Sequence, residues 1–122
     1  MTQHEVLIDF PWAFEKIKSG QKTIERRMYD DKFRAIKIGD TILFVNLANG
    51  ETVTCDVKGL CIFPNYTELM RVVDAKACGW NKEDEAIQDP DGFIERNYGQ
   101  FGYTKENIKK YGAVGIVIKL CS

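Results

Sequence analysis

The sequence lacks the patterns that would indicate a metal site or a membrane span. It contains one histidine, His4, and four cysteines, no two of which have the close spacing of a zinc-binding pair. Its longest apolar runs, Thr41–Val45 and Ala113–Ile118, are far shorter than the roughly 20 residues that a membrane-spanning helix needs. The first residues show no basic stretch leading into an apolar one, which argues against a secretory signal. We therefore expect a cytoplasmic protein with no metal, no cofactor and no membrane partner.

The composition is that of a folded domain. The chain has 122 residues, of which 44% are hydrophobic and 29% charged, and no repeat or linker divides it, so we expect residues 1–122 to form a single domain. A chain of this length buries enough surface to form one core without disulfides. Cys55 alternates with Val53 and Val57, which predicts that it points into that core. We expect the cysteines to be structural.

Charge is distributed unevenly along the chain, although the formal net charge is only −1. Residues 15–37 contain eight basic and four acidic residues, a balance of +4, whereas residues 79–103 contain two basic and six acidic residues, a balance of −4. The first segment could attract an anionic ligand that the second would repel. The alternative is that both segments form solvent-exposed faces.

The hydrophobic pattern predicts strands separated by a few short helices. A helix is expected from Pro11 to Gly20, another after Asn65, and a third between Thr104 and Gly112. Residues 79–103 have no clear period and should form loops with short helical turns. Strands are predicted at Glu5–Asp9, Lys22–Met28, from Ile36 onward, at Thr41–Val45, at Thr52–Ile62 and at Ala113–Leu120.

These elements predict an α+β fold that is mainly β, a small barrel of five to six strands with two to three helices. Curling the sheet into a barrel protects edges that would otherwise be exposed. Thr41–Val45 and Ala113–Leu120 are apolar on both faces, so we expect them to be central strands. Phe14 and Ile17 should pack against them from the first helix.

One short segment concentrates charged side chains in the pattern G-x-K-x-x-E-x-R, formed by Gly20, Lys22, Glu25 and Arg27. A carboxylate between two cations can bind an anion and a polar base edge together. The alternative is a structural cluster of ion pairs at a strand end. In a regular strand Lys22 would point away from Glu25 and Arg27, so the three meet only if the chain is irregular near Gly20.

The same segment carries a resemblance to a known family. Residues 14–27 follow the pattern F-E-x-I-x-x-G-x-K-T-I-E-x-R, residues 36–44 follow I-K-x-G-D-x-I-x-F, and the tail at 111–116 reads Y-G-A-V-G-I. Together they resemble the ASCH domain, a member of the PUA-like superfamily. The resemblance implies a PUA-like barrel with a cleft lined by the motif, and binding of RNA or nucleotides. Some small bacterial members remove the acetyl group of N4-acetylcytidine, and ribonuclease activity is associated with others.

The resemblance assigns Lys22, Glu25 and Arg27 to ligand binding, and Lys22 and Glu25 to catalysis only if the protein is an enzyme. In the amidohydrolase members the position three after the lysine is a threonine, taken as the nucleophile, whereas here it is Glu25. A carboxylate does not replace a hydroxyl that must be acylated and released. That mechanism also needs a second carboxylate, for which Glu68 and Glu83 are candidates.

Aromatic residues accumulate late in the chain, and Tyr98 and Tyr103, flanked by glycines, are the candidates for stacking on a base. The alternative is that these rings anchor a long loop to the barrel. The acidic balance of residues 79–103 favours a nucleoside, a nucleotide or a single flipped base over an extended duplex. The sequence thus predicts nucleotide-like ligand or RNA binding. A small amidohydrolase or ribonuclease, or a protein-interaction domain with a structural ion cluster, remains the alternative, and the oligomeric state is left open.

Overall fold

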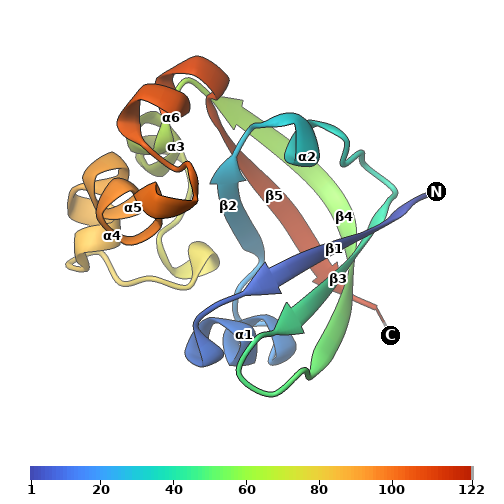
Figure 1. The fold of residues 1–122 in the computed structure, drawn as a ribbon. Helices are drawn as coiled ribbons and strands as arrows, with labels where there is room; N and C mark the ends of the chain where they lie inside the picture. The colour runs from blue at the N-terminus through green and yellow to red at the C-terminus, as the bar shows by residue number, and fades with distance from the viewer. Residues whose placement is uncertain (122) are drawn as a thin grey trace.

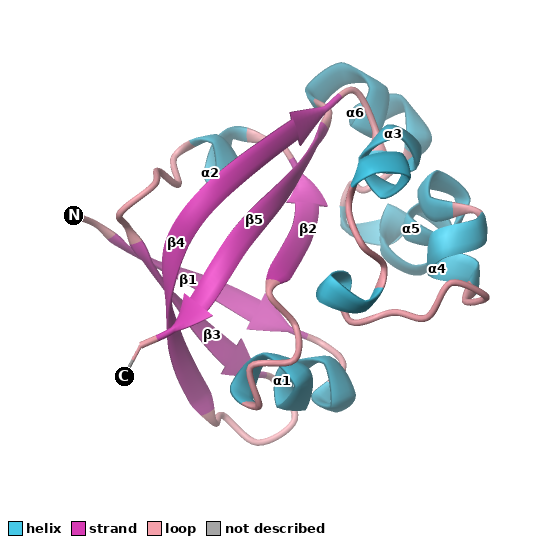
Figure 2. Ribbon diagram, turned by 180° about the vertical axis from the view of Figure 1, so that it is seen from behind, coloured by secondary structure: helices cyan, strands magenta, loops and turns pink. Residues whose placement is uncertain are grey.

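Five strands form one curled sheet, shown in Figures 1 and 2. This is a computed structural model, and it describes residues 1–121. The strand order is β1-β3-β4-β5-β2, with β1 parallel to β3 and all other neighbours antiparallel. The strands are β1 (Gln3–Ile8), β2 (Ile24–Met28), β3 (Thr41–Asn46), β4 (Thr52–Phe63) and β5 (Ala113–Leu120).

The sheet is a half-barrel, because its first and last strands, β1 and β2, do not pair with each other. The five strands agree with the predicted number, and β3 and β5 are interior, which confirms their predicted central position. The long strand β4 pairs with both β3 and β5 and changes register between Val57 and Gly59. An irregularity of this kind bends a strand and increases its twist, which allows β4 to belong to both halves of the curl.

The helices outnumber the two to three that were predicted. They are α1 (Pro11–Lys18), α2 (Asp31–Arg34), α3 (Tyr66–Val72), α4 (Glu85–Gln88), α5 (Pro90–Tyr98) and α6 (Lys105–Tyr111), with 3₁₀ turns η1 (Lys76–Cys78) and η2 (Gly99–Phe101). The main correction is α5, in a segment predicted to be mostly loop. Its buried residues are Pro90, Gly92 and Ile94, and because two of the three are not large and apolar, no helical hydrophobic period is visible in the sequence.

The extended piece predicted to begin at Ile36 is also wrong. The chain turns there, with the N–H of Asp40 donating to the carbonyl of Lys37 and the N–H of Lys37 donating to the carboxylate of Asp40. Ile36 is buried in the core, whereas Ile38 is exposed. A four-residue helix, α2, precedes this turn and is capped by Asp30, whose side chain accepts from the N–H of Phe33.

Helix boundaries that depend on local chemistry are where the sequence placed them. Pro11 begins α1, and Gly20 follows its end with φ of +82°. The side chains of Asn65 and Thr104 cap α3 and α6 by accepting from backbone N–H groups three residues later. These helices are therefore fixed at their ends by interactions within one turn.

The core has two parts on different sides of the sheet. One lies between the strands and α1 and includes Phe14, Ile17 and Cys55, all at most 1% exposed, as predicted. The other includes Tyr66, Leu69 and Ile108 from α3 and α6. Helices α3 to α6 gather beside the free edge of β2, and α1 lies near the ends of β1 and β3 (Figures 1 and 2).

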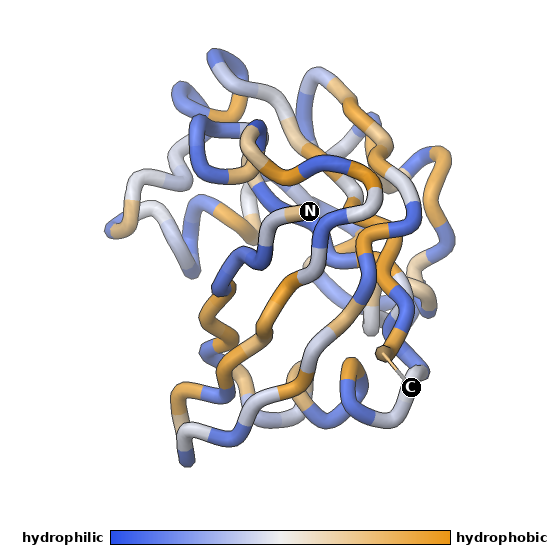
Figure 3. The backbone as a smooth tube through the Cα atoms, turned by 90° about the vertical axis from the view of Figure 1, so that its right-hand side faces the viewer, coloured by the Kyte–Doolittle hydropathy of each residue, from blue (hydrophilic) through white to orange (hydrophobic). Residues whose placement is uncertain are grey.

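Hydrophobic residues recur along the chain between hydrophilic ones, as the tube in Figure 3 shows. Within residues 1–121, no helix is long and apolar enough to cross a membrane.

Candidate functional site

A cavity of about 520 Å³ opens where the half-barrel fails to close. Its walls come from β1 and the start of α1 on one side and from β2 on the other. A third wall is formed by α5, η2 and the following residues as far as Tyr103. Because β2 is an edge strand, one side of its backbone pairs with no further strand. We call this cavity the cleft.

Lys22, Glu25 and Arg27 converge in the cleft. The Nζ atom of Lys22 lies 2.5 Å from Oε1 of Glu25, and Nε of Arg27 lies 2.7 Å from Oε2 of the same carboxylate. Nη2 of Arg27 also donates to the carbonyl oxygen of Leu7 at 3.0 Å. Arg27 therefore joins the two unpaired edges of the sheet, β2 and β1, across the mouth of the half-barrel.

An irregular entry to β2 explains how Lys22 reaches the same carboxylate as Arg27. The N–H of Lys22 donates to the carbonyl of Lys16, and the N–H of Thr23 donates to that of Ala77, so the strand begins only at Ile24. Strand alternation does not apply to Lys22, and its side chain turns toward Glu25. The irregularity near Gly20, on which the meeting of the three side chains depends, is present.

Glu25 and Arg27 hold each other in their charged forms. Burial would raise the pKa of Glu25, but the positive charges of Lys22 and Arg27 and their hydrogen bonds outweigh it and lower that pKa to about 2. Burial would lower the pKa of Arg27, and the charge of Glu25 raises it instead. Glu25 is thus an ionised carboxylate near neutral pH, able to accept hydrogen bonds but not to donate a proton.

Tyr98 and Tyr103 both line the cleft, with ring centroids 6.3 Å apart. Burial raises the pKa of Tyr98 to about 12 and raises that of Tyr103 as well. Both hydroxyls therefore stay neutral near pH 7 and can donate hydrogen bonds. The sequence predicted these two tyrosines as site residues, and the structure places both beside the charged trio.

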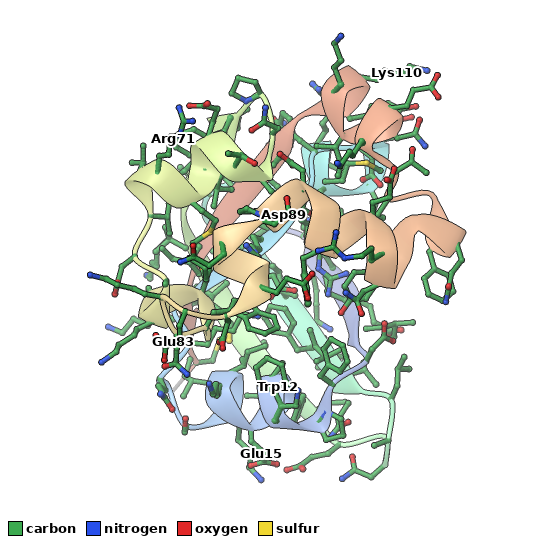
Figure 4. The ribbon with its side chains drawn as sticks, turned by 90° about the vertical axis from the view of Figure 1, so that its left-hand side faces the viewer. Trp12, Glu15, Arg71, Glu83, Asp89 and Lys110 are labelled. Carbon is green, nitrogen blue, oxygen red and sulfur yellow. The ribbon has the colours of Figure 1, made fainter. Side chains whose placement is uncertain are left out.

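Further rings complete an aromatic wall, of which the sequence analysis missed the part on α1. Trp12 rises from α1 toward the opposite wall (Figure 4). Its ring stacks with Phe10 at 5.6 Å and meets Trp80 edge-on at 4.8 Å, and Trp80 meets Phe93 at 5.3 Å. The sequence pattern of residues 10–12 predicts only the start of a helix. It does not indicate whether their rings face a cleft or the core.

The proposed second carboxylates are not in the cleft. Glu68 is paired with Arg71 on the surface, Glu83 is exposed, and neither lines the cavity. The acidic residues that line it besides Glu25 are Asp9 and Asp30, which the sequence analysis did not select. Thr23 lines a separate, smaller cavity of about 140 Å³.

Arg26 is another cleft residue that the sequence analysis missed. It is 7% exposed, and its Nη1 donates to the carbonyl of Ala86 at 2.9 Å. Its guanidinium carbon lies 5.6 Å and 5.7 Å from the ring centroids of Tyr66 and Trp80. Strand alternation placed Arg26 opposite Glu25, but the helices beside the β2 edge extend the cleft around the strand, so both residues line it.

Comparison with known proteins gives one family and several structural relatives. The family model for the ASCH domain matches residues 10–122. The crystal structure of the hypothetical protein PH0355 is similar with a TM-score of 0.74 and 28% identity, covering 99% of this chain and 100% of that one. The solution structure of protein PF0455 from Pyrococcus furiosus has a TM-score of 0.67 and 27% identity, covering 98% of each chain.

An ASCH domain from Lactobacillus crispatus shares the fold, with a TM-score of 0.62 and 13% identity over 98% of this chain and 79% of that one. No curated protein matches the chain.

Proposed function

The chain belongs to the ASCH domain family, and on this basis we propose that it binds a nucleotide-like ligand, or a single RNA base, in the cleft. The observation that carries the proposal is the convergence of Lys22, Glu25 and Arg27 on one open cavity that aromatic rings also line. A structural ion cluster needs no such cavity, so the geometry favours a binding site over the protein-interaction alternative.

Each group of the trio keeps capacity for a ligand. Each oxygen of Glu25 accepts one hydrogen bond, from Lys22 or from Arg27, and retains a further lone pair. These lone pairs can accept a hydrogen bond from an amino or imino group of a base. Lys22 and Arg27 retain N–H donors for carbonyl or phosphate oxygens. The rings of Trp12, Tyr98 and Tyr103 supply faces on which a planar base can stack, each worth about 1–3 kcal/mol.

The size of the cleft favours one nucleotide over a longer strand. A volume of about 520 Å³ is within the roughly 300–1,000 Å³ of small-molecule sites. A nucleoside, a nucleotide or a base turned out of a single strand would fill such a cavity, whereas a duplex would not enter it.

The enzyme alternatives fit the geometry less well. A general acid or base needs a pKa near the working pH, and that of Glu25 is about 2 because two cations hold it. The hydroxyl that the amidohydrolase members use is missing from position 25, and Thr23 faces a different cavity. Binding without turnover is the function that these residues support best.

The replacement Arg27→Lys tests the proposal. Arginine holds Glu25 and the carbonyl of Leu7 through separate N–H groups, which a lysine ammonium does not reproduce in this geometry. We expect about tenfold weaker binding of nucleoside 5′-monophosphates or short single-stranded RNA, measured by titration calorimetry, with an unchanged circular dichroism spectrum. Arg34→Lys, outside the cleft, is the matched control and should bind like the original protein. Equal affinity of the Arg27→Lys variant would indicate a structural ion cluster.

A further inference from the structure

Two buried polar atoms beside the trio have no hydrogen-bond partner. Within residues 1–121, the fully buried side-chain nitrogen and oxygen atoms without a partner are Nη2 of Arg26 and Oη of Tyr66. Arg26 is 7% exposed, Tyr66 is fully buried, and both residues line the cleft. A buried unpaired polar group costs about 1–3 kcal/mol, so finding two side by side requires an explanation.

The Arg26 side chain and the backbone of Tyr66 are held in place by other hydrogen bonds. Nη1 of Arg26 donates to the carbonyl of Ala86, and the N–H of Tyr66 donates to the carboxylate of Asp91 at 2.9 Å. The guanidinium lies over the Tyr66 ring. Burial raises the pKa of Tyr66 well above its usual value, so its hydroxyl keeps its proton. The pair therefore offers fixed donors and calls for an acceptor.

The charges of the cleft show which acceptor fits. Lys22 and Arg27 already share the carboxylate of Glu25, and no carboxylate of the described chain, including those of Asp9 and Asp30 in the cleft wall, forms an ion pair with Arg26. Arg26 is thus a buried cation of the cleft without an ion-pair partner. A guanidinium keeps its charge even when burial lowers its pKa, as here. An anionic group of a ligand would supply the missing countercharge, as well as oxygens for both donors.

We propose that Arg26 and Tyr66 form an oxyanion subsite of the cleft, and that it binds the phosphate of a nucleoside monophosphate. This inference rests on the proposed function, in which the base of the same ligand meets Glu25 and the aromatic wall. The ring of Trp80 lies over the Arg26 guanidinium and covers it from solvent together with Tyr66. The proposal therefore requires the Trp80 side chain to turn aside when the phosphate enters.

Titration calorimetry with the four nucleosides and their four 5′-monophosphates tests the subsite. We expect the intact protein to bind the preferred monophosphate at least about tenfold more tightly than its nucleoside, as charged hydrogen bonds allow. Tyr66→Phe, which removes one oxygen atom, should weaken monophosphate binding about fivefold without changing nucleoside binding. Because that oxygen has no partner, this variant should also keep its thermal midpoint.

The second variant, Arg26→Met, should abolish the preference for the monophosphate. The matched controls are Tyr29→Phe and Arg34→Met, which remove a hydroxyl and a guanidinium outside the cleft. Both controls should keep the preference for the monophosphate. If Arg26→Met does not fold, the affinity of Tyr66→Phe for the monophosphate is the deciding measurement.

Three outcomes distinguish this inference from the proposed function. Equal affinity for nucleoside and monophosphate overturns the subsite and leaves nucleoside binding in the cleft standing. A preference that survives in Tyr66→Phe and in a folded Arg26→Met also overturns the subsite, because the phosphate is then bound elsewhere. Binding of none of the eight compounds, and of no short single-stranded RNA, by the intact protein overturns both proposals.

Discussion

At the scale of single residues, the site is organised around Glu25. Its carboxylate accepts from Lys22 and Arg27 and is 4% exposed, so it has the charge and the fixed position that the proposed ligand-orienting role needs. In the resembling hydrolases a threonine stands at this place. Glu25 thus stands where those hydrolases have a hydroxyl nucleophile. Its carboxylate accepts hydrogen bonds, but it neither forms a stable ester nor transfers a proton near neutral pH.

This difference leads to a prediction about N4-acetylcytidine. We expect the unmodified protein to leave it uncleaved, measured by chromatography of the released cytidine. Glu25→Thr would place a hydroxyl three residues after Lys22, and we expect at most slow hydrolysis from it, because no second carboxylate from Glu68 or Glu83 reaches the cleft. Efficient cleavage by the unmodified protein that Glu25→Gln abolishes would show instead that Glu25 activates a water molecule.

At the scale of elements, the junctions around the strands position the site. The irregular segment before β2 turns Lys22 inward, and the junction of α6 with β5 fixes the strand that pairs with β2. At this second junction Gly112 has φ of +84° and ψ of −173°, a conformation that is essentially restricted to glycine. Its carbonyl accepts from the N–H of Tyr29, just after β2 ends.

Gly112→Ala is therefore expected to be destabilising. Besides the backbone strain, an added Cβ would lie 2.7 Å from the carbonyl oxygen of Phe63, which cannot move without disturbing β4. We expect the free energy of unfolding to fall by more than about 2 kcal/mol, measured by urea denaturation. The matched control is Gly99→Ala, where φ is −58° and the new Cβ would have only an ordinary contact with Glu95. A Gly112→Ala variant as stable as this control would contradict the account.

At the scale of the whole molecule, two carboxylates hold the edge strand β1 in place, one near each of its ends. Glu25 orients Arg27, which bonds across the mouth to β1. At the other end of β1, Asp40 lies 2.8 Å from Nε2 of His4 and accepts from the N–H groups of Thr2 and Lys37. The bond with His4, followed by those two backbone bonds, lowers the pKa of Asp40 to about 2.

These two pKa values predict how stability depends on pH. A carboxylate with a lowered pKa in the folded protein stabilises it above the unfolded pKa, 4.5 for Glu25 and 3.8 for Asp40, and loses that contribution as pH falls toward about 2. We expect the free energy of unfolding to decrease steadily between about pH 4.5 and 2, measured by denaturation at each pH. Asp40→Asn should flatten part of this decrease. A constant stability over that interval would contradict both pKa shifts.

The sequence by itself determined what depends on neighbours along the chain. The caps at Asn65 and Thr104 and the turn at Gly20 act within one helical turn. The apolar composition of β3 and β5 on both faces was enough to predict their interior position in the sheet. The motif also identified Lys22, Glu25 and Arg27 as a group, because their side chains are charged and closely spaced.

Only the tertiary structure decided how those side chains are arranged. Lys22 meets Glu25 because the N–H of Thr23 bonds to Ala77, a partner far away in the sequence that keeps this segment out of the strand. The buried residues of helix α5 are Pro90, Gly92 and Ile94, a set with no helical hydrophobic period. Arg26 is buried because helices cover the edge of β2, and strand alternation, a rule for one strand, contains no information about what packs beside that edge.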